Sequence, residues 1–256
     1  MTTLLLLSLA AFFAGFVDSI AGGGGLIQLP ALFVFLPPSI AANVPQVMGI
    51  NKFSSICGTS VATFQYAQKV KFRWGILIPI ALCAWVFSFF GAKTVSIIDK
   101  ELIRPVILVL LAVVAVYTYT RKPNAPTAIE MKEKFRVPLA IATGGAIGFY
   151  DGFFGPGTGT FLLIAFVSFF ALDFLNASAH AKAVNLATNI AAVTVFAAQG
   201  NIPYNYAIPM AVANVAGAFI GSRMAILKGS EFVRKFLLAV VLLLIMRFAY
   251  EIAYPK

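Results

Sequence analysis

Four ionisable side chains lie within or at the ends of long apolar segments: Asp18, Lys52, Asp151 and Lys182. A charge at the centre of a bilayer costs at least ~2.5–3.5 kcal/mol on insertion scales, so such side chains usually pair or face a cavity. A lysine beside amide and hydroxyl groups offers positive charge together with hydrogen-bond donors. These residue types predict a binding site for a small anion; a purely structural ion pair between helices is the alternative.

Both lysines lie in segments that are dense in Asn, Ser and Thr: "GINKFSS" (49–55) and "HAKAVNLATN" (180–189). In a helix, Lys182, Asn185 and Asn189 are spaced i, i+3 and i+7, so they share one face. The predicted anion ligands from these two segments are Lys52, Lys182, Asn51, Ser55, Asn185 and Asn189.

The two aspartates lie in glycine-rich stretches, "GFVDSIAGGGG" (15–25) and "GFYDGFFGPGTG" (148–159). Each glycine in a helix interior costs roughly 1 kcal/mol relative to alanine, so these clusters predict breaks in the helices. A break followed by a short helix, 25–37 or 158–171, presents free N–H groups and a positive dipole end to an anion. Tight helix packing by small residues is the alternative. The predicted ligands from the breaks are Gly24, Gly25, Gly157 and Gly159.

Three residues are candidates for coupling or gating. Asp18 and Asp151 would orient the breaks or carry protons. His180 is the only histidine. It is either a proton relay beside Lys182 or a satisfied polar contact, because an imidazole titrates near neutral pH and also makes ordinary hydrogen bonds.

The elements that carry these residues are apolar. Hydrophobic residues make up 61% of the 256 and charged residues 11%, whereas soluble domains are ~25% charged. Runs such as 74–92 and 101–120 approach the ~20 residues that cross a bilayer. The composition therefore predicts an all-α polytopic membrane protein. The net charge of +10 lies in the gaps between apolar runs and forms no basic stripe, which excludes nucleic-acid binding.

The chain contains an internal duplication. The two glycine-rich stretches match at an offset that aligns Asp18 with Asp151, and a slightly smaller offset later aligns Lys52 with Lys182. Identities at charged, Gly and Pro positions do not arise from hydrophobic composition alone, so we interpret the chain as two copies of one unit. The predicted organisation is a first membrane repeat (1–120), a cytoplasmic linker (121–136) and a second membrane repeat (137–256).

The distribution of charge predicts that the copies are inverted. Each glycine-broken pair would return the chain to its starting side, which gives about eight long membrane segments and two short ones. The loops 68–73, 121–136 and 223–235 then share one side with twelve Lys and Arg, against five on the other. The positive-inside rule makes the first side cytoplasmic and both termini periplasmic. Inverted repeats with discontinuous helices are typical of secondary transporters, whose sites lie near the bilayer midplane.

These motifs resemble the TauE/SafE family of sulfite and organosulfonate exporters, also called toluene-sulfonate uptake permeases. The resemblance rests on "GFVDSIAGGGGLIQLPAL" (15–32), "NK" (51–52), "GFYDGFFGPGTGTF" (148–161) and the segment around Lys182, and it covers nearly the whole chain. It implies a secondary transporter that exports sulfite or organosulfonates across the bacterial cell inner membrane. The expected partners are a small anion and the lipid bilayer, with homo-oligomerisation left open, and no cofactor or metal is expected.

Other function classes remain as alternatives. An enzyme is disfavoured because the chain has no GxSxG, HExxH or paired-cysteine motif. A passive anion channel, or a carrier of a non-sulfur organic anion, would need the same cage of donors. Flux measurements separate channel from carrier, because a carrier saturates.

Overall fold

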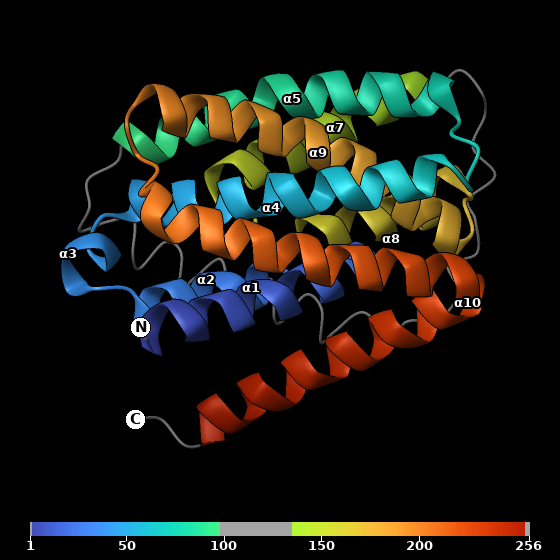
Figure 1. The fold of residues 1–256 in the computed structure, drawn as a ribbon. Coiled ribbons are helices and arrows are strands. Elements are labelled where there is room, and N and C mark those ends of the chain that lie inside the picture. The colour runs from blue at the N-terminus through green and yellow to red at the C-terminus, as the bar shows by residue number, and fades with distance from the viewer. Residues whose placement is uncertain (1, 98–134, 254–256) are drawn as a thin grey trace.

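The computed structural model describes residues 2–97 and 135–253, and every regular element in these two ranges is a helix (Figure 1). The predicted all-α class is thereby confirmed for this part of the chain. The elements are α1 (Thr2–Ala21), α2 (Gly25–Phe35), α3 (Pro38–Ala41), α4 (Val44–Ala67), α5 (Trp74–Ile97), α7 (Arg136–Phe153), α8 (Thr158–Phe170), α9 (Phe174–Ala198) and α10 (Tyr204–Ala253).

Both glycine clusters break a helix, as predicted. The first cluster separates α1 from α2, and Gly22 and Gly23 there have φ of 80° and 93°. The second separates α7 from α8, with φ of 93° at Gly155 and 81° at Gly157. These angles lie in the left-handed region, which glycine reaches without the penalty of a Cβ atom. The backbone therefore leaves the helix at these points because of the glycines.

Two predicted boundaries differ from the structure. The predicted segment 41–67 begins at Val44, because the proline-rich stretch before it forms the short helix α3. The predicted loop within 223–235 is shorter than expected: two helical stretches, which together form α10, meet at a kink at Gly229 (φ 75°, ψ −168°), and the chain reverses direction there (Figure 1). A single glycine makes the reversal, so the basic residues on either side stay helical. The predicted segment 101–120 and the linker up to residue 134 lie outside the described residues.

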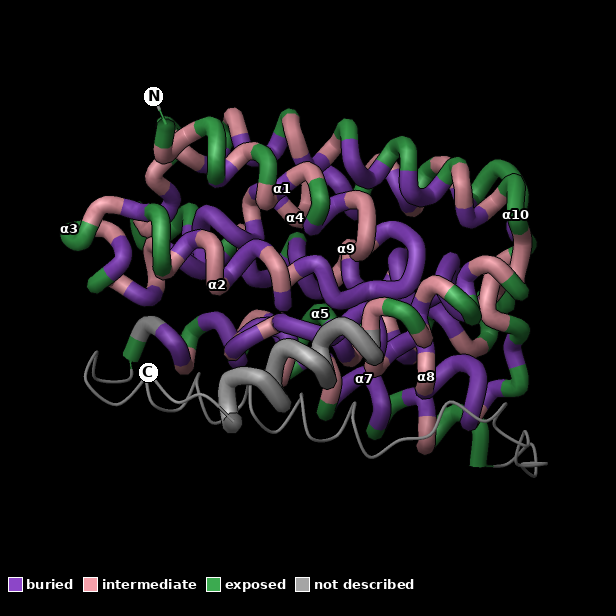
Figure 2. Tube along the Cα trace, turned by 90° about the horizontal axis from the view of Figure 1, so that it is seen from below, coloured by how far each residue is buried: buried purple, intermediate pink, exposed green. Residues whose placement is uncertain are grey.

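Four of the described helices are long and apolar enough to cross a membrane: Thr2–Ala21, Trp74–Val95, Phe174–Ala198 and Tyr204–Val240. Large apolar side chains such as Leu5, Leu82 and Val212 are exposed on the outside of the bundle. Figure 2 shows the buried positions on the inner faces and the exposed turns on the outside. A hydrophobic exterior of this kind suits a lipid environment.

The order of contacts along neighbouring helices gives their directions. Gly148 packs on Ala84 and Gly152 on Ser88, so α7 runs parallel to α5. By the same reasoning α1, α4 and the first half of α10 run parallel to one another, and so do α5, α7 and α9. Between α4 and α9 the order is reversed, because Thr59 meets Asn189 whereas Tyr66 meets Ser178. Helices α1 and α7, which carry the two aspartates, therefore point in opposite directions.

The two halves of the chain exchange helix contacts. Helix α1 packs chiefly on α10, and α7 packs chiefly on α5. A Cβ atom on Gly221 would lie less than 3.0 Å from the Phe16 carbonyl oxygen, and one on Gly91 less than 3.0 Å from that of Phe149. These two contacts occupy equivalent positions in the predicted duplication. Each broken helix is thus held by a helix from the other half.

The hydrophobic core consists of two clusters at opposite ends of the bundle. One contains the start of α1 and of α4, represented by Leu7 and Val47, and the other contains their ends, represented by Ile20 and Tyr66. The charged positions on α1 and α4 fall between these clusters. The site described next therefore lies at the middle level of the bundle.

Candidate functional site

A small polar cavity lies where the two helix breaks meet α4 and α9. It has a volume of about 20 Å³, which is room for roughly one water molecule. A sulfonate is larger, so binding one requires the surrounding helices to separate. The lining residues are Asp18, Gly23, Gly25, Asn51, Lys52, Ser55, Asp151, Gly155, Gly157, Thr158, Gly159, Asn185 and Asn189.

Most of the residues predicted from the sequence are thus brought together. Two further ones adjoin the lining: Lys182 pairs with Asp18, and Gly24 donates its N–H to the same carboxylate. Sequence reasoning missed Gly23, Gly155 and Thr158. The signal for all three was present in the glycine clusters, since Thr158 lies between the predicted ligands Gly157 and Gly159.

The first ion pair joins Lys52 on α4 to Asp151 on α7. The Lys52 Nζ atom lies 2.8 Å from Asp151 Oδ1, and the two side chains are 3% and 2% exposed. The other carboxylate oxygen, Asp151 Oδ2, is buried and accepts no hydrogen bond from any described residue. Asn51 Oδ1, in the same cavity wall, likewise has no donor within the described ranges.

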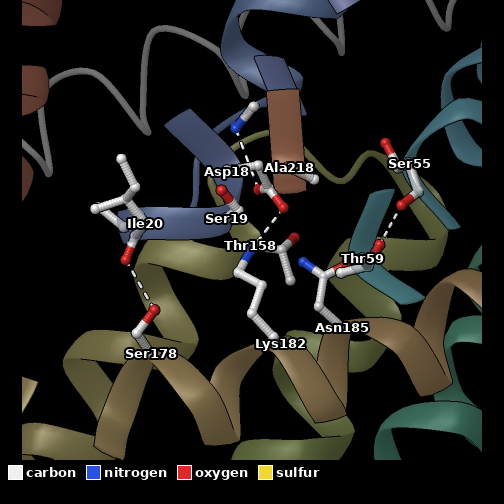
Figure 3. Close-up of polar contacts among 12 residues, drawn as sticks. Asp18, Ser19, Ile20, Ser55, Thr59, Thr158, Ser178, Lys182, Asn185 and Ala218 are labelled. Carbon is white, nitrogen blue, oxygen red and sulfur yellow. Dashed lines mark hydrogen bonds and ion pairs between the residues drawn. The ribbon is translucent and has the colours of Figure 1, made fainter. Parts of the chain in front are cut away.

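The second ion pair joins Lys182 on α9 to Asp18 on α1, as Figure 3 shows. The Lys182 Nζ atom lies 2.6 Å from Asp18 Oδ2. The Asp18 Oδ1 atom accepts the Gly24 N–H at 3.2 Å, so both oxygens of this carboxylate have a donor. Its side chain is 23% exposed, in contrast to the closed environment of Asp151.

The two pairs cross between the halves of the chain. Each lysine binds the aspartate of the other half, so the four charges cancel within one buried region. An anion that enters must compete with a carboxylate for an ammonium group. The site is therefore neutral when its four charged groups are all ionised, yet it holds two cations that an anion can reach by displacing a carboxylate.

An amide chain on α9 supports the cavity wall. The Asn189 amide donates to Asn185 Oδ1 at 2.7 Å and to Thr59 Oγ1 at 3.1 Å, and Thr59 in turn donates to the Ser55 carbonyl. The predicted face of α9 is thus formed by hydrogen-bonded side chains. Thr59 was not predicted, because its partner lies 130 residues away in the sequence.

Side chains from three helices hold the end of α1 at its break. The last carbonyl groups of a helix have no partner within it, and inside a membrane they need one. The Tyr66 hydroxyl donates to the Ser19 carbonyl, the Ser178 hydroxyl to Ile20 and the Thr160 hydroxyl to Ala21. Figure 3 shows the Ser178 contact beside the ion pair. The broken end is therefore fixed by packing against α4, α8 and α9.

His180 does not line the cavity. Its Nε2 atom accepts the Arg73 N–H at 2.9 Å, and its Nδ1 lies 2.7 Å from the Asn176 carbonyl, which it can reach only as a donor. The ring also packs on Phe72 and Phe166. Both ring nitrogens are thus occupied, by the residue before α5 and by the preceding turn of α9, although His180 lies only two residues from Lys182.

Comparisons with known proteins agree with the motifs. The family model described as sulfite exporter TauE/SafE matches residues 7–248. The chain is 32% identical to a probable membrane transporter protein, ORF9, of Sinorhizobium sp, over 98% of this chain and 94% of that protein. It is 31% identical to the probable membrane transporter protein YfcA of Escherichia coli strain K12, over 94% and 87% of the two chains. It is 23% identical to the probable membrane transporter protein YdhB of Bacillus subtilis, over 87% and 89%. No solved structure gives a significant match.

Proposed function

This chain belongs to the sulfite exporter TauE/SafE family of membrane transporters, and from that premise we propose that it is a secondary carrier of small sulfur oxyanions. The proposed substrates are sulfite or organosulfonates, exported across the bacterial inner membrane. Sulfur oxyanions present several acceptor oxygens to ammonium, amide and backbone N–H groups, which are the donors found around the cavity.

The observation that carries the proposal is the convergence of Lys52 and Lys182 on one buried region between two broken helices. A buried ammonium is expensive, so two of them at one place favour a role beyond packing. The polar residues of α4 and α9 supply further donors on either side. The small volume of the cavity supports a carrier that closes around its substrate more than an open channel.

The helix directions support a carrier built from two inverted repeats, 1–120 and 137–256. Equivalent helices of the two halves point in opposite directions, and the equivalent ion pairs cross between them. In such carriers the two repeats rock about a site at their interface, near the bilayer midplane. We extend the proposal to the topology, with the linker cytoplasmic and both termini periplasmic.

Transport by purified protein in proteoliposomes tests this function. We expect saturable uptake of sulfite or sulfoacetate, weaker uptake of acetate, and no uptake of a cation. Replacing Lys182 by Met removes one charge-assisted contact worth about 1.5–3 kcal/mol, so the dissociation constant should rise roughly 10- to 100-fold. Lys182→Arg should retain weaker binding with an altered preference among anions, because guanidinium is broad and planar.

Lys235→Met is the matched control, since this lysine is 73% exposed and pairs with Glu231 on the surface of α10. It should transport like the wild type. Flux that rises with anion concentration without saturating would identify a channel. Unchanged affinity for the anion in a folded Lys182→Met protein would show that this lysine does not contact the substrate.

A further inference from the structure

The charge balance of the cavity constrains what can bind there. Lys52 and Lys182 are fully matched by Asp151 and Asp18, and these side chains are buried apart from part of Asp18. An anion added to this neutral group brings an unmatched negative charge into a region with little water, which is costly. The cost disappears if one carboxylate becomes neutral at the same time.

We propose that Asp151 takes up one proton each time the cavity binds an anion, so that the anion and the proton are carried together. This inference rests on the proposed function and names its coupling ion. The proton comes from water and forms an O–H bond at Asp151 Oδ2. The carboxyl group then carries no charge, and the Lys52 ammonium is left with its charge for the anion.

The different surroundings of the two aspartates select Asp151. Hydrogen bonds to a carboxylate favour its charged form, and burial favours its neutral form. Asp18 receives donors on both oxygens and is 23% exposed, whereas Asp151 receives one donor, on Oδ1, and is 2% exposed. Protonation therefore costs Asp151 fewer stabilising hydrogen bonds and less hydration than it costs Asp18.

The wall of the cavity also offers a partner for the added proton. Asn51 Oδ1 is a buried acceptor without a donor among the described residues, and it lines the same cavity as Asp151. A carboxylate can only accept hydrogen bonds, whereas a protonated carboxyl group can donate one. Lys52 from α4 pairs with Asp151, and Asp18 from α1 and the uncharged Thr158 from α8 line the same cavity. Lys182 from α9 neutralises Asp18, and the neighbouring Tyr150 on α7 also interacts electrostatically with Asp151.

Counting protons during binding tests the proposal. Methanesulfonate and isethionate serve as probes because each keeps a single negative charge near neutral pH, whereas sulfite itself takes up protons there. We expect the full-length protein in weakly buffered detergent solution to take up about one proton per bound anion, measured with a pH indicator. By linkage, the affinity for the anion should fall about tenfold for each unit by which the pH rises, over the range where this uptake occurs.

Infrared difference spectra of the same wild-type protein give a second measurement that needs no variant. Anion binding should add one protonated-carboxyl band, and this band should be absent in Asp151→Asn. In Asp151→Asn, anion binding should take up no proton and lose its pH dependence. In Asp18→Asn/Lys182→Met, which removes one whole ion pair and keeps the cavity neutral, the carboxyl band and the proton uptake should persist.

The possible failures are distinct. Anion binding by the wild type without proton uptake, or uptake that requires sodium instead, overturns this proposal and leaves the proposed function in place. A carboxyl band that survives Asp151→Asn, or that disappears in Asp18→Asn/Lys182→Met while the anion still binds, assigns the proton to another carboxylate and also overturns it. A wild type that binds neither probe nor sulfite refutes the proposed function, and the coupling falls with it.

Discussion

Replacing each buried lysine by methionine should destabilise the protein by different amounts. Removing one partner of a buried ion pair typically costs about 3–5 kcal/mol, because the other charge is left unpaired. Lys52→Met should reach this range, since Asp151 is 2% exposed and keeps no other donor within the described chain. Lys182→Met should cost roughly half as much, because Asp18 is 23% exposed and keeps the Gly24 N–H.

Unfolding of the purified protein in mixed detergent micelles, followed by tryptophan fluorescence, measures these costs. Each lysine variant is combined with the matching aspartate-to-asparagine variant in a double-mutant cycle, which isolates the energy of the pair. The double variant Lys52→Met/Asp151→Asn should recover most of the stability lost in Lys52→Met. The coupling energy should be about twice as large for this pair as for Lys182 with Asp18.

The exposed pair Glu231–Lys235 provides the control, with side chains 77% and 73% exposed. Pairs of this kind contribute about 0–1 kcal/mol, so Lys235→Met should be close to neutral. Equal losses in the two buried-lysine variants would refute the argument from burial. No loss in either would show that the lysines are not paired in the folded protein.

Three further predictions follow from other contacts. Gly221→Ala should lose about 1–3 kcal/mol of stability through overpacking against the Phe16 carbonyl, whereas Gly75→Ala, with no atom within 4 Å of its added Cβ, should lose none; equal stabilities would disprove the close contact. Asp173→Ala removes the N-terminal cap of α9 and should cost about 0.5–2 kcal/mol at neutral pH. Burial acts to raise the pKa of Asp173, but hydrogen bonds from Asn176, Ser230 and the Leu175 N–H outweigh it and hold that pKa below its ordinary value. The stabilisation is thus complete above the unfolded pKa of about 3.9 and lost as pH falls through the folded value; a difference in unfolding midpoint that grows at low pH would contradict this. Reporters placed within 121–136 and after the C-terminus should lie on opposite sides of the membrane, and finding both on the same side would reject the inverted topology.

The helix breaks could be predicted from the sequence because their cause is local. The glycine clusters need no distant partner to disfavour a helix, and Gly22 and Gly157 adopt the left-handed angles that glycine reaches most easily. The charged positions could be identified for a similar reason, since a lysine in an apolar segment is expensive wherever it packs.

Which residues meet could not be read from local pattern. The sequence places two lysines and two aspartates within or at the ends of apolar segments, but it does not show that Lys52 pairs with Asp151 and Lys182 with Asp18. The environment of His180 depends on the Arg73 N–H, 107 residues away. The turn predicted within 223–235 is present, but its shortness could not be predicted, because the single residue Gly229 makes the kink between the two halves of α10.

The crossed ion pairs also set an order for the synthesis of the protein. Asp18 leaves the ribosome 164 residues before Lys182, which at ~5–20 residues per second is a delay of about 8–30 s. During that time the first half of the nascent chain carries a carboxylate and an ammonium whose partners do not yet exist. The first half must therefore wait in a partly inserted or water-exposed state until the second half arrives. A ribosome that stalls beyond Lys52 but before Asp151 would leave a membrane fragment that cannot neutralise its own charges, and such a fragment is a natural target for quality-control proteolysis.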